Sequence, residues 1–310
     1  MSLETPAPDL VRRFIVEDRP VRGHWVRIAS AWQALREHQD YPGPVRELLG
    51  QAVSASVLLA STLKFRGTLT LQLHGNGAAR MLVAQCTHDF GVRALLRLED
   101  RALELPEGPQ GTALTPGLFR QLVGGEGRIV VTIEAAERAQ RYQGIVPLAG
   151  GSFAECLETY FGSSEQLPTR VRLAADETHA AGLLIQKLPE ASEPGETESA
   201  WVEAQAGMGS VGRLELLSAP VEEMLLRRFG GRDLRLFKGA PVRFECRCDP
   251  GRVVGLLKAL GPDEVRDVLR EQGAVTVTCD FCNRPYHFDP LDVERLFAGG
   301  EPSQPPVSLH

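Results

Sequence analysis

The first sixty residues combine two strand patterns with one long helical pattern. Strands are predicted over Val11–Val16 and Val21–Ile28, followed by a short helix near Ala31–His38. After the helix-stopping sequence Tyr41–Pro44, apolar and small residues recur at helical spacing from Val45 to Leu63. We therefore expect a long helix there, packed closely through its small side chains.

Further segments alternate with the two-residue period of strands, and the sequence Gly75-Asn-Gly77 is typical of a hairpin turn. Such alternation predicts an antiparallel meander with one face buried. The segments are Thr68–Leu73, Met81–Cys86, Val92–Leu98, Arg128–Ile133 and Tyr142–Val146.

The character of the chain changes near residue 190. The stretch 189–198 carries four glutamates and no basic residue, which indicates a solvated boundary. Apolar residues are frequent from Trp201 to Phe237, but glycines interrupt them, and each costs a helix roughly 0.8–1 kcal/mol relative to alanine. This segment is therefore expected to be helical but marginally stable.

The C-terminal part has few apolar residues. Val253, Leu256, Leu257 and Leu260 predict one apolar helix face, and Pro262 opens a second helix that ends at Gly273. A unit of about sixty residues with so small a core is at the size where a metal is often needed for stability.

Four of the six cysteines lie in this part, as Cys246-Arg-Cys248 and Cys279-Asp-Phe-Cys282. Two such pairs in one short unit predict a tetrahedral Zn²⁺ site with Zn–S distances of about 2.3 Å. Permanent disulfides and a thioredoxin-like dithiol are the alternatives. The dithiol is disfavoured because the Cys-x-x-Cys follows a β-branched run rather than opening a helix.

The other two cysteines are interpreted as core residues. Cys156 shares one face of a helix, capped by Ser152, with Phe153 and Tyr160, and Cys86 lies in an alternating strand. Buried cysteine usually behaves as a small hydrophobic residue.

The predicted fold class is α+β: an N-terminal domain with antiparallel sheets and packed helices, a helical linker, and a small C-terminal zinc-binding domain. The expected boundaries are 1–190, 191–245 and 246–290, with a disordered tail over 291–310. With 310 residues, 43% of them hydrophobic and 24% charged, the composition is that of an ordinary globular protein.

Charge and motifs exclude several function classes. A net charge of −6 argues against a broad basic face for nucleic acid. No secretion signal or membrane-spanning apolar run is recognised, so we expect a cytoplasmic protein without membrane contact. No Walker A loop, Rossmann fingerprint or nucleophile elbow is present, and the scattered histidines form no catalytic arrangement, so we do not expect an enzyme.

Several stretches together resemble the heat-shock protein 33 family of redox-regulated chaperonins. The similarity spans nearly the whole chain and is weakest at 189–235 and after Asp289. The stretches that carry it include Phe244–Cys248, Val277–Asn283, Tyr286–Phe288, Leu69–Leu73, Tyr142–Leu148 and Ala154–Glu158.

The resemblance implies a holdase that is silent while Cys246, Cys248, Cys279 and Cys282 bind one Zn²⁺ per chain in the reduced state. It implies that oxidants form Cys246–Cys248 and Cys279–Cys282 disulfides and expel zinc, so that the chain binds unfolded or misfolded client proteins under oxidative and heat stress. Residues 1–190 would then be the chaperone core, 191–245 a metastable linker and 246–290 the redox switch. A homodimer on activation and transfer of clients to an ATP-dependent chaperone system are also implied.

Two other classes remain open on the residues alone. A zinc ribbon binding nucleic acid would use cations such as Arg247, Arg252 and Lys258, although nearby aspartates offset them. A thiol-disulfide oxidoreductase would use Cys279 and Cys282 directly.

Overall fold

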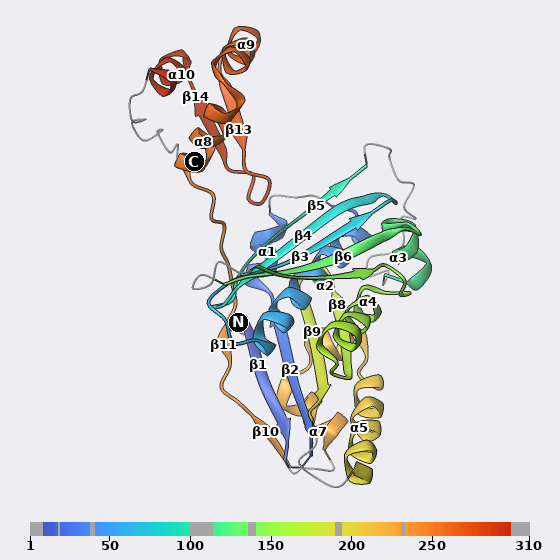
Figure 1. Ribbon diagram of the computed structural model, residues 1–310. Helices are drawn as coiled ribbons and strands as arrows, with labels where there is room; N and C mark the ends of the chain where they lie inside the picture. The colour runs from blue at the N-terminus through green and yellow to red at the C-terminus, as the bar shows by residue number, and fades with distance from the viewer. Residues whose placement is uncertain are drawn as a thin grey trace, which may run out of the picture. The chain divides into compact units, whose positions relative to one another are not determined.

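The computed structural model describes residues 9–17, 19–37, 41–99, 114–135, 141–189, 194–230 and 233–298. The chain divides into two compact units, Met1–Glu245 and Cys246–His310 (Figure 1). His38 and residues 190–193 of the acidic stretch 189–198 lie outside the described residues.

The first sheet of the larger unit is antiparallel. Its strands β1 (Leu10–Val16) and β2 (Val21–Ile28) form the predicted hairpin, and β9 (Ala180–Lys187) and β8 (Thr169–Ala175) continue the sheet from β2. The other edge of β1 pairs with two short late strands, β10 (Leu234–Leu236) and β11 (Ala240–Pro241). Residues far apart in sequence therefore close this edge.

The second sheet has the predicted antiparallel pairing, but only its strands between Gly67 and Leu98 follow one another as a meander, because the next strand, Gly127–Ala135, pairs with Gly67–Gly75. Its order is β12-β5-β4-β3-β6-β7, and every pair is antiparallel except β12 with β5, which is parallel. Alternate residues such as Leu71 face the buried side. The strands are β3 (Gly67–Gly75), β4 (Ala79–Thr87), β5 (Gly91–Leu98), β6 (Gly127–Ala135), β7 (Arg141–Pro147) and β12 (Arg243–Phe244).

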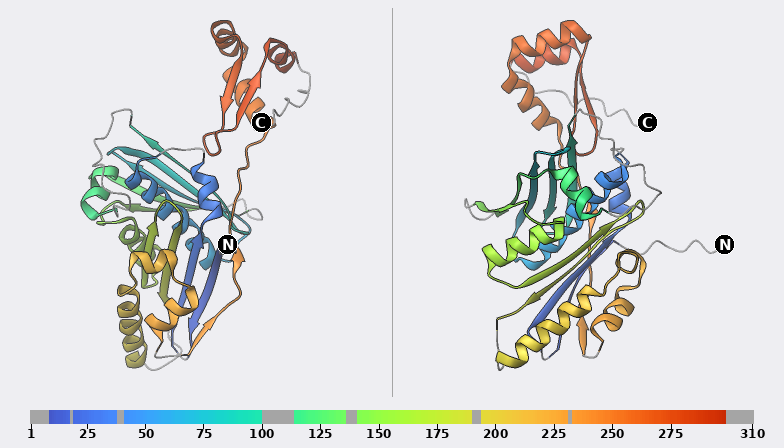
Figure 2. Two further views of the ribbon diagram at one scale, coloured as in Figure 1. Left: turned by 180° about the vertical axis from the view of Figure 1, so that it is seen from behind. Right: turned by 90° about the vertical axis from the view of Figure 1, so that its right-hand side faces the viewer.

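Helix α2 (Gly43–Thr62) is the predicted long helix, and it lies between the two sheets (Figure 2). Sixteen of its 20 residues are buried, as expected for a helix covered on all sides. A Cβ on Gly50 would lie 2.4 Å from the Cβ of Ala175, so the close approach to the first sheet requires glycine there. Helices α1 (Ser30–Arg36), α3 (Pro116–Val123) and α4 (Phe153–Tyr160), with a π-helical turn at Phe161–Glu165, complete this part.

Three helices cover the other face of the first sheet: α5 (Pro194–Gly209), α6 (Arg213–Ser218) and α7 (Val221–Phe229). Trp201, Met224 and Phe229 form a buried cluster there with Phe14 and Trp25 of the sheet. Helix α5 begins at Pro194, inside the predicted solvated boundary at 189–198, where Thr197 is buried and the Glu198 side chain is 63% exposed. The helical character of this part was predicted, but its docking on the sheet was not.

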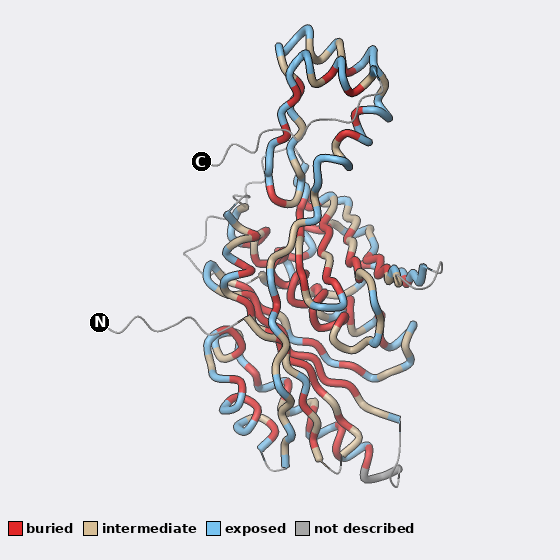
Figure 3. Tube along the Cα trace, turned by 90° about the vertical axis from the view of Figure 1, so that its left-hand side faces the viewer, coloured by how far each residue is buried: buried red, intermediate tan, exposed pale blue. Residues whose placement is uncertain are grey.

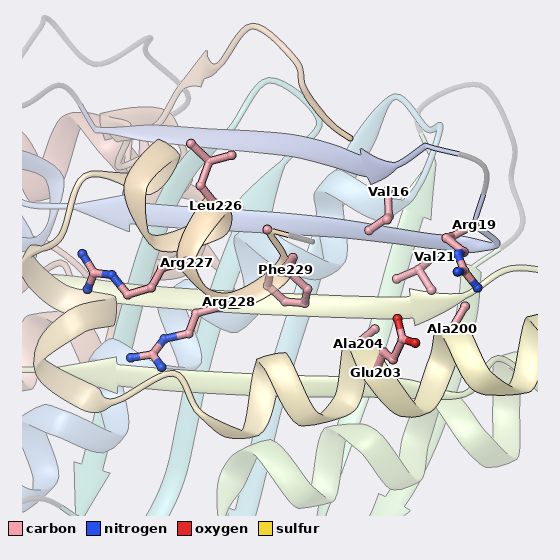
Figure 4. A pocket seen from close by; sticks show the side chains of 11 residues that line it. Val16, Arg19, Val21, Ala200, Glu203, Ala204, Leu226, Arg227, Arg228 and Phe229 are labelled. Atoms are coloured by element: carbon pink, nitrogen blue, oxygen red, sulfur yellow. The ribbon is translucent and has the colours of Figure 1, made fainter. Parts of the chain in front are cut away.

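A cavity of about 550 Å³ remains between these helices and the sheet (Figure 4). Val16 and Val21 come to it from the sheet, and Ala204 and Phe229 from α5 and α7. The helices thus cover the apolar sheet face without filling all the space above it.

The smaller unit contains α8 (Pro250–Leu260), α9 (Pro262–Gln272), the hairpin β13 (Val275–Thr278) and β14 (Pro285–Phe288), and α10 (Pro290–Phe297). Much of it is exposed in Figure 3, and eight buried residues form the core among the described residues of this unit. They are Val254, Leu257, Val265, Val275, Tyr286, Phe288, Val293 and Leu296.

Two predictions for this unit are corrected. Val254 joins Leu257 on the buried side of α8, while Leu256 and Leu260 are 53% and 56% exposed. The tail was expected from residue 291, but Asp289 caps α10, whose Val293 packs into the core. Residues 299–310 lie outside the described residues.

Candidate metal centre

The Cys-x-x-Cys pair lies in the turn that joins β13 to β14. The Cys279 N–H donates to the Arg284 carbonyl at 3.0 Å, and the Asn283 N–H donates to the Cys279 carbonyl at 2.8 Å. Asn283 adopts a left-handed conformation, with φ of 50°, which asparagine tolerates better than most residues. The turn between Thr278 and Pro285 therefore fixes the backbone around Cys279 and Cys282.

The Cys-x-Cys pair lies in the irregular stretch between β12 and α8. Asp249 follows Cys248 directly and caps α8 by accepting the Arg252 N–H at 3.0 Å, and Pro250 occupies the first helical turn. The start of the helix thus holds the end of this stretch in place.

The structure brings the four predicted cysteines together. Their sulfur atoms all lie within 4.8 Å of one another, with Sγ–Sγ distances of 3.7 Å for Cys246–Cys279 and 3.5 Å for Cys248–Cys282. A tetrahedron with Zn–S bonds of about 2.3 Å has an edge of about 3.8 Å, so these spacings suit one zinc ion. All four thiols are free. Within the described ranges, no other group of three or more His, Cys, Asp or Glu residues has comparable geometry.

The electrostatics of the site favour a bound cation. Burial raises the pKa of Cys246 and Cys282, although the backbone N–H groups of Cys248 and Arg284 act in the opposite direction. At Cys248 burial is outweighed by Tyr286 and the neighbouring thiols, and the pKa is lowered. Four adjacent thiols cannot all ionise without compensation, and a divalent cation supplies it.

The remaining two cysteines lie in the core of the larger unit, as predicted. Cys86 and Cys156 are both fully buried, and burial raises the pKa of each thiol. A buried thiol with a raised pKa contains little thiolate and reacts slowly.

Sequence reasoning missed one polar feature, an ion pair between α6 and α2. The Arg213 guanidinium lies 3.4 Å from the buried Glu47 carboxylate, and the two residues are 166 positions apart. No local pattern marks either residue, because such a contact depends on how the whole chain folds.

Fold and site together define a class of protein in which a large α+β unit is followed by a small unit whose four cysteines could hold a metal ion. The profile of the Hsp33 protein family matches residues 9–289. The chain belongs to the Hsp33 family of chaperonins, and its general function is that of a chaperone.

Individual relatives agree. The "33 kDa chaperonin" of Nitrosococcus oceani is 41% identical over 93% of this chain and 94% of its own length. That of Methylobacillus flagellatus is 39% identical over the same shares. The crystal structure of the 33 kDa chaperonin (heat shock protein 33 homolog) from Thermotoga maritima shares the fold, with a TM-score of 0.79 at 24% identity over 94% of this chain and 98% of that one.

Among the described residues, no helix combines the length and the apolar character needed to cross a bilayer.

Proposed function

We propose that the protein is a redox-regulated holdase whose switch is the four-cysteine centre. The observation that carries this proposal is the gathering of four thiols within 4.8 Å inside a unit that has only eight buried core residues among those described. Cys246, Cys248, Cys279 and Cys282 bind one Zn²⁺ per chain in the reduced state. When bound, the ion cross-links four thiolates and so stabilises a core too small to fold alone.

Thiolates are the form of cysteine that peroxide and hypochlorous acid oxidise. Each equivalent of oxidant takes two electrons from one cysteine pair, so that two equivalents convert four thiolates into the disulfides Cys246–Cys248 and Cys279–Cys282. Hypochlorous acid is reduced to chloride and water, or peroxide to water. The sulfurs then lack the negative charge that retains a divalent cation, and zinc leaves.

Loss of the metal unfolds residues 246–290, and this change is transmitted to residues 191–245, which act as a metastable linker. Only Glu245 separates Cys246 from β12, whose Arg243 and Phe244 pair with β5. Helices α5–α7 precede this point and cover the first sheet. Their release exposes the apolar face around Phe14 and Trp25, the kind of surface that binds unfolded polypeptide.

The partners follow from this activity. Unfolding or misfolded proteins are the clients, bound in the cytoplasm under oxidative or heat stress and protected from aggregation. As the family resemblance implies, activation is accompanied by formation of a homodimer, and clients pass to an ATP-dependent chaperone system. The chain has no Walker A sequence, which is consistent with holding clients rather than refolding them.

The test is a titration of the reduced, zinc-loaded chain with hypochlorous acid. Zinc release is followed with a chromogenic chelator, and light scattering of a heat-unfolded client is followed in the same samples. Zinc release and aggregation suppression should rise together and reverse with reductant plus zinc. Cys156→Ala serves as a matched control that leaves both curves unchanged, because Cys156 is buried outside the centre.

Zinc release without client protection would refute the proposal. Salt-dependent binding of labelled nucleic acid by the zinc form, or turnover in an insulin-reduction assay, would then favour the zinc-ribbon or oxidoreductase class.

A further inference from the structure

Arg213, at the start of helix α6, places its guanidinium group against the buried carboxylate of Glu47 in helix α2. Arg213 contacts both carboxylate oxygens of Glu47 at 3.4 Å, through Nε and Nη2, and Nη2 also donates to the Ala175 carbonyl. The Glu47 side chain is 6% exposed and that of Arg213 is 26% exposed. We call the cavity of about 430 Å³ beside this pair, with Glu47 in its wall, the Glu47 socket.

The charges that line the socket are balanced while Arg213 is present. Glu47, Glu155 and Glu158 face Arg170, Arg172 and Arg213. Glu158 is occupied by Arg170 at 3.1 Å and by the Val171 N–H at 2.8 Å, and Glu155 accepts the Gly151 N–H at 2.7 Å. Glu47 is therefore the carboxylate in this wall whose cationic partner lies on α6.

Glu47 has two further partners, and both are neutral. The Leu114 N–H donates to it at 2.9 Å and the Gln51 amide at 3.2 Å. When α6 leaves, these two donors remain at Glu47 but Arg213 does not, so the three carboxylates of the cavity wall face two guanidinium groups. A buried carboxylate in that state favours any incoming cation that can reach it.

The residues that follow Arg213 supply a second recognition element. Leu216 and Leu217 lie three and four positions later, on the same helical face, and each is only 2% exposed. Both belong to the cluster formed with Phe14 and Trp25 of the first sheet. The docked helix thus combines one cation in the socket with two aliphatic side chains on the sheet.

We propose that the Glu47 socket is a client-binding site for segments with a basic residue followed at the third and fourth positions by aliphatic residues, and that α6 occupies it as a resident mimic of such a client. This inference rests on the proposed holdase function. It adds a sequence preference, because a purely apolar surface would not distinguish arginine from a neutral residue of similar size.

The test uses fluorescence anisotropy with the full-length, oxidised, zinc-free protein. The first probe is a labelled peptide that copies residues 211–219, Val-Gly-Arg-Leu-Glu-Leu-Leu-Ser-Ala. The second carries Gln in place of Arg, and the third carries Ala in place of the two Leu residues at the third and fourth positions after Arg. We expect each substitution to weaken binding about tenfold or more, as for loss of a charged hydrogen bond or of two buried side chains.

A Glu47→Gln variant provides the matched control, because glutamine retains the shape and the acceptor for the Leu114 N–H. The preference for Arg over Gln should fall to about twofold or less in this variant, while the preference for the Leu pair persists. The comparison of the Arg and Gln peptides uses the unaltered protein. It therefore tests the preference for a basic residue even if the variant folds poorly.

Equal affinity for the Arg and Gln peptides would overturn the inference, and so would a preference for Arg that survives in Glu47→Gln. Aggregation suppression is measured on the same oxidised samples. If suppression is intact while the peptide preference is absent, the socket is refuted and the holdase function stands. If suppression itself is absent, the holdase function fails.

Discussion

Removing the metal from the reduced chain should unfold the smaller unit and leave the sheets of the larger one intact. The described part of that unit comprises about 50 residues, for which typical stabilities of 0.05–0.15 kcal/mol per residue give roughly 3–8 kcal/mol in total. A structural zinc site supplies about 10–16 kcal/mol. The contribution of the metal thus exceeds the total free energy of unfolding. Without zinc, the unfolded form of this unit should be favoured over the folded form by at least about 2 kcal/mol.

Hydrogen exchange measured by mass spectrometry is the appropriate assay, with a strong chelator and reductant present so that no disulfide forms. Peptides covering β13 and β14 should lose protection, while peptides covering β3 and β4 keep it. Tryptophan emission gives an independent signal, because all three tryptophans, Trp25, Trp32 and Trp201, lie in the larger unit. Trp201 and Trp25 belong to the cluster between α5–α7 and the sheet, so a red shift reports release of those helices.

Retained protection of β13 and β14 after complete zinc removal would refute the reasoning, since the eight-residue core would then be sufficient for folding. Loss of protection with unchanged tryptophan emission would refute the proposed coupling but not the structural role of the metal.

Three further predictions concern single residues. Burial lowers the pKa of His24 to about 3 from its ordinary 6.5, so below pH 6.5 this histidine binds a proton in the unfolded chain but not in the folded one. The free energy of unfolding, measured with urea, should therefore fall by about 2 kcal/mol between pH 7 and pH 5, and His24→Gln should remove this dependence. Arg213→Ala leaves the buried Glu47 carboxylate without a cationic partner and should cost about 3–5 kcal/mol, seen as a red-shifted emission or a lower urea midpoint of the reduced protein. Arg227 is exposed, so Arg227→Ala should cost under about 1 kcal/mol; equal effects of the two substitutions would contradict a stabilising role of the Arg213–Glu47 pair. Leu257→Ala should destabilise the smaller unit by about 2–5 kcal/mol in thermal unfolding, and Leu256→Ala by under about 0.5 kcal/mol, because only Leu257 is buried. A larger effect of Leu256→Ala would show that Leu256 is buried, as the sequence predicted.

The sequence determined the elements whose signal is local. Two-residue alternation predicted the strands of the second sheet, and the run of apolar and small residues from Val45 predicted a long, closely packed helix; that this helix is covered on all sides came from the structure. The candidate site was also predicted, because the two cysteines of each motif, Cys-x-Cys and Cys-x-x-Cys, are only two or three positions apart in the sequence and are therefore close in any fold. The sequence also predicted that the two motifs meet, and the structure shows the elements that bring them together, the β13–β14 turn and the start of α8.

The tertiary structure decided whatever depends on a neighbour distant in the chain. Helix α8 offers apolar residues on more than one side, and the position of α9 and the hairpin decides that Val254, rather than Leu256, is buried. The docking of α5–α7 on the first sheet and the pairing of Arg213 with Glu47 are of the same kind. Periodicity shows that a face is apolar but not what covers it, and a charge can be paired across 166 residues only after the sheets and helices between them have folded.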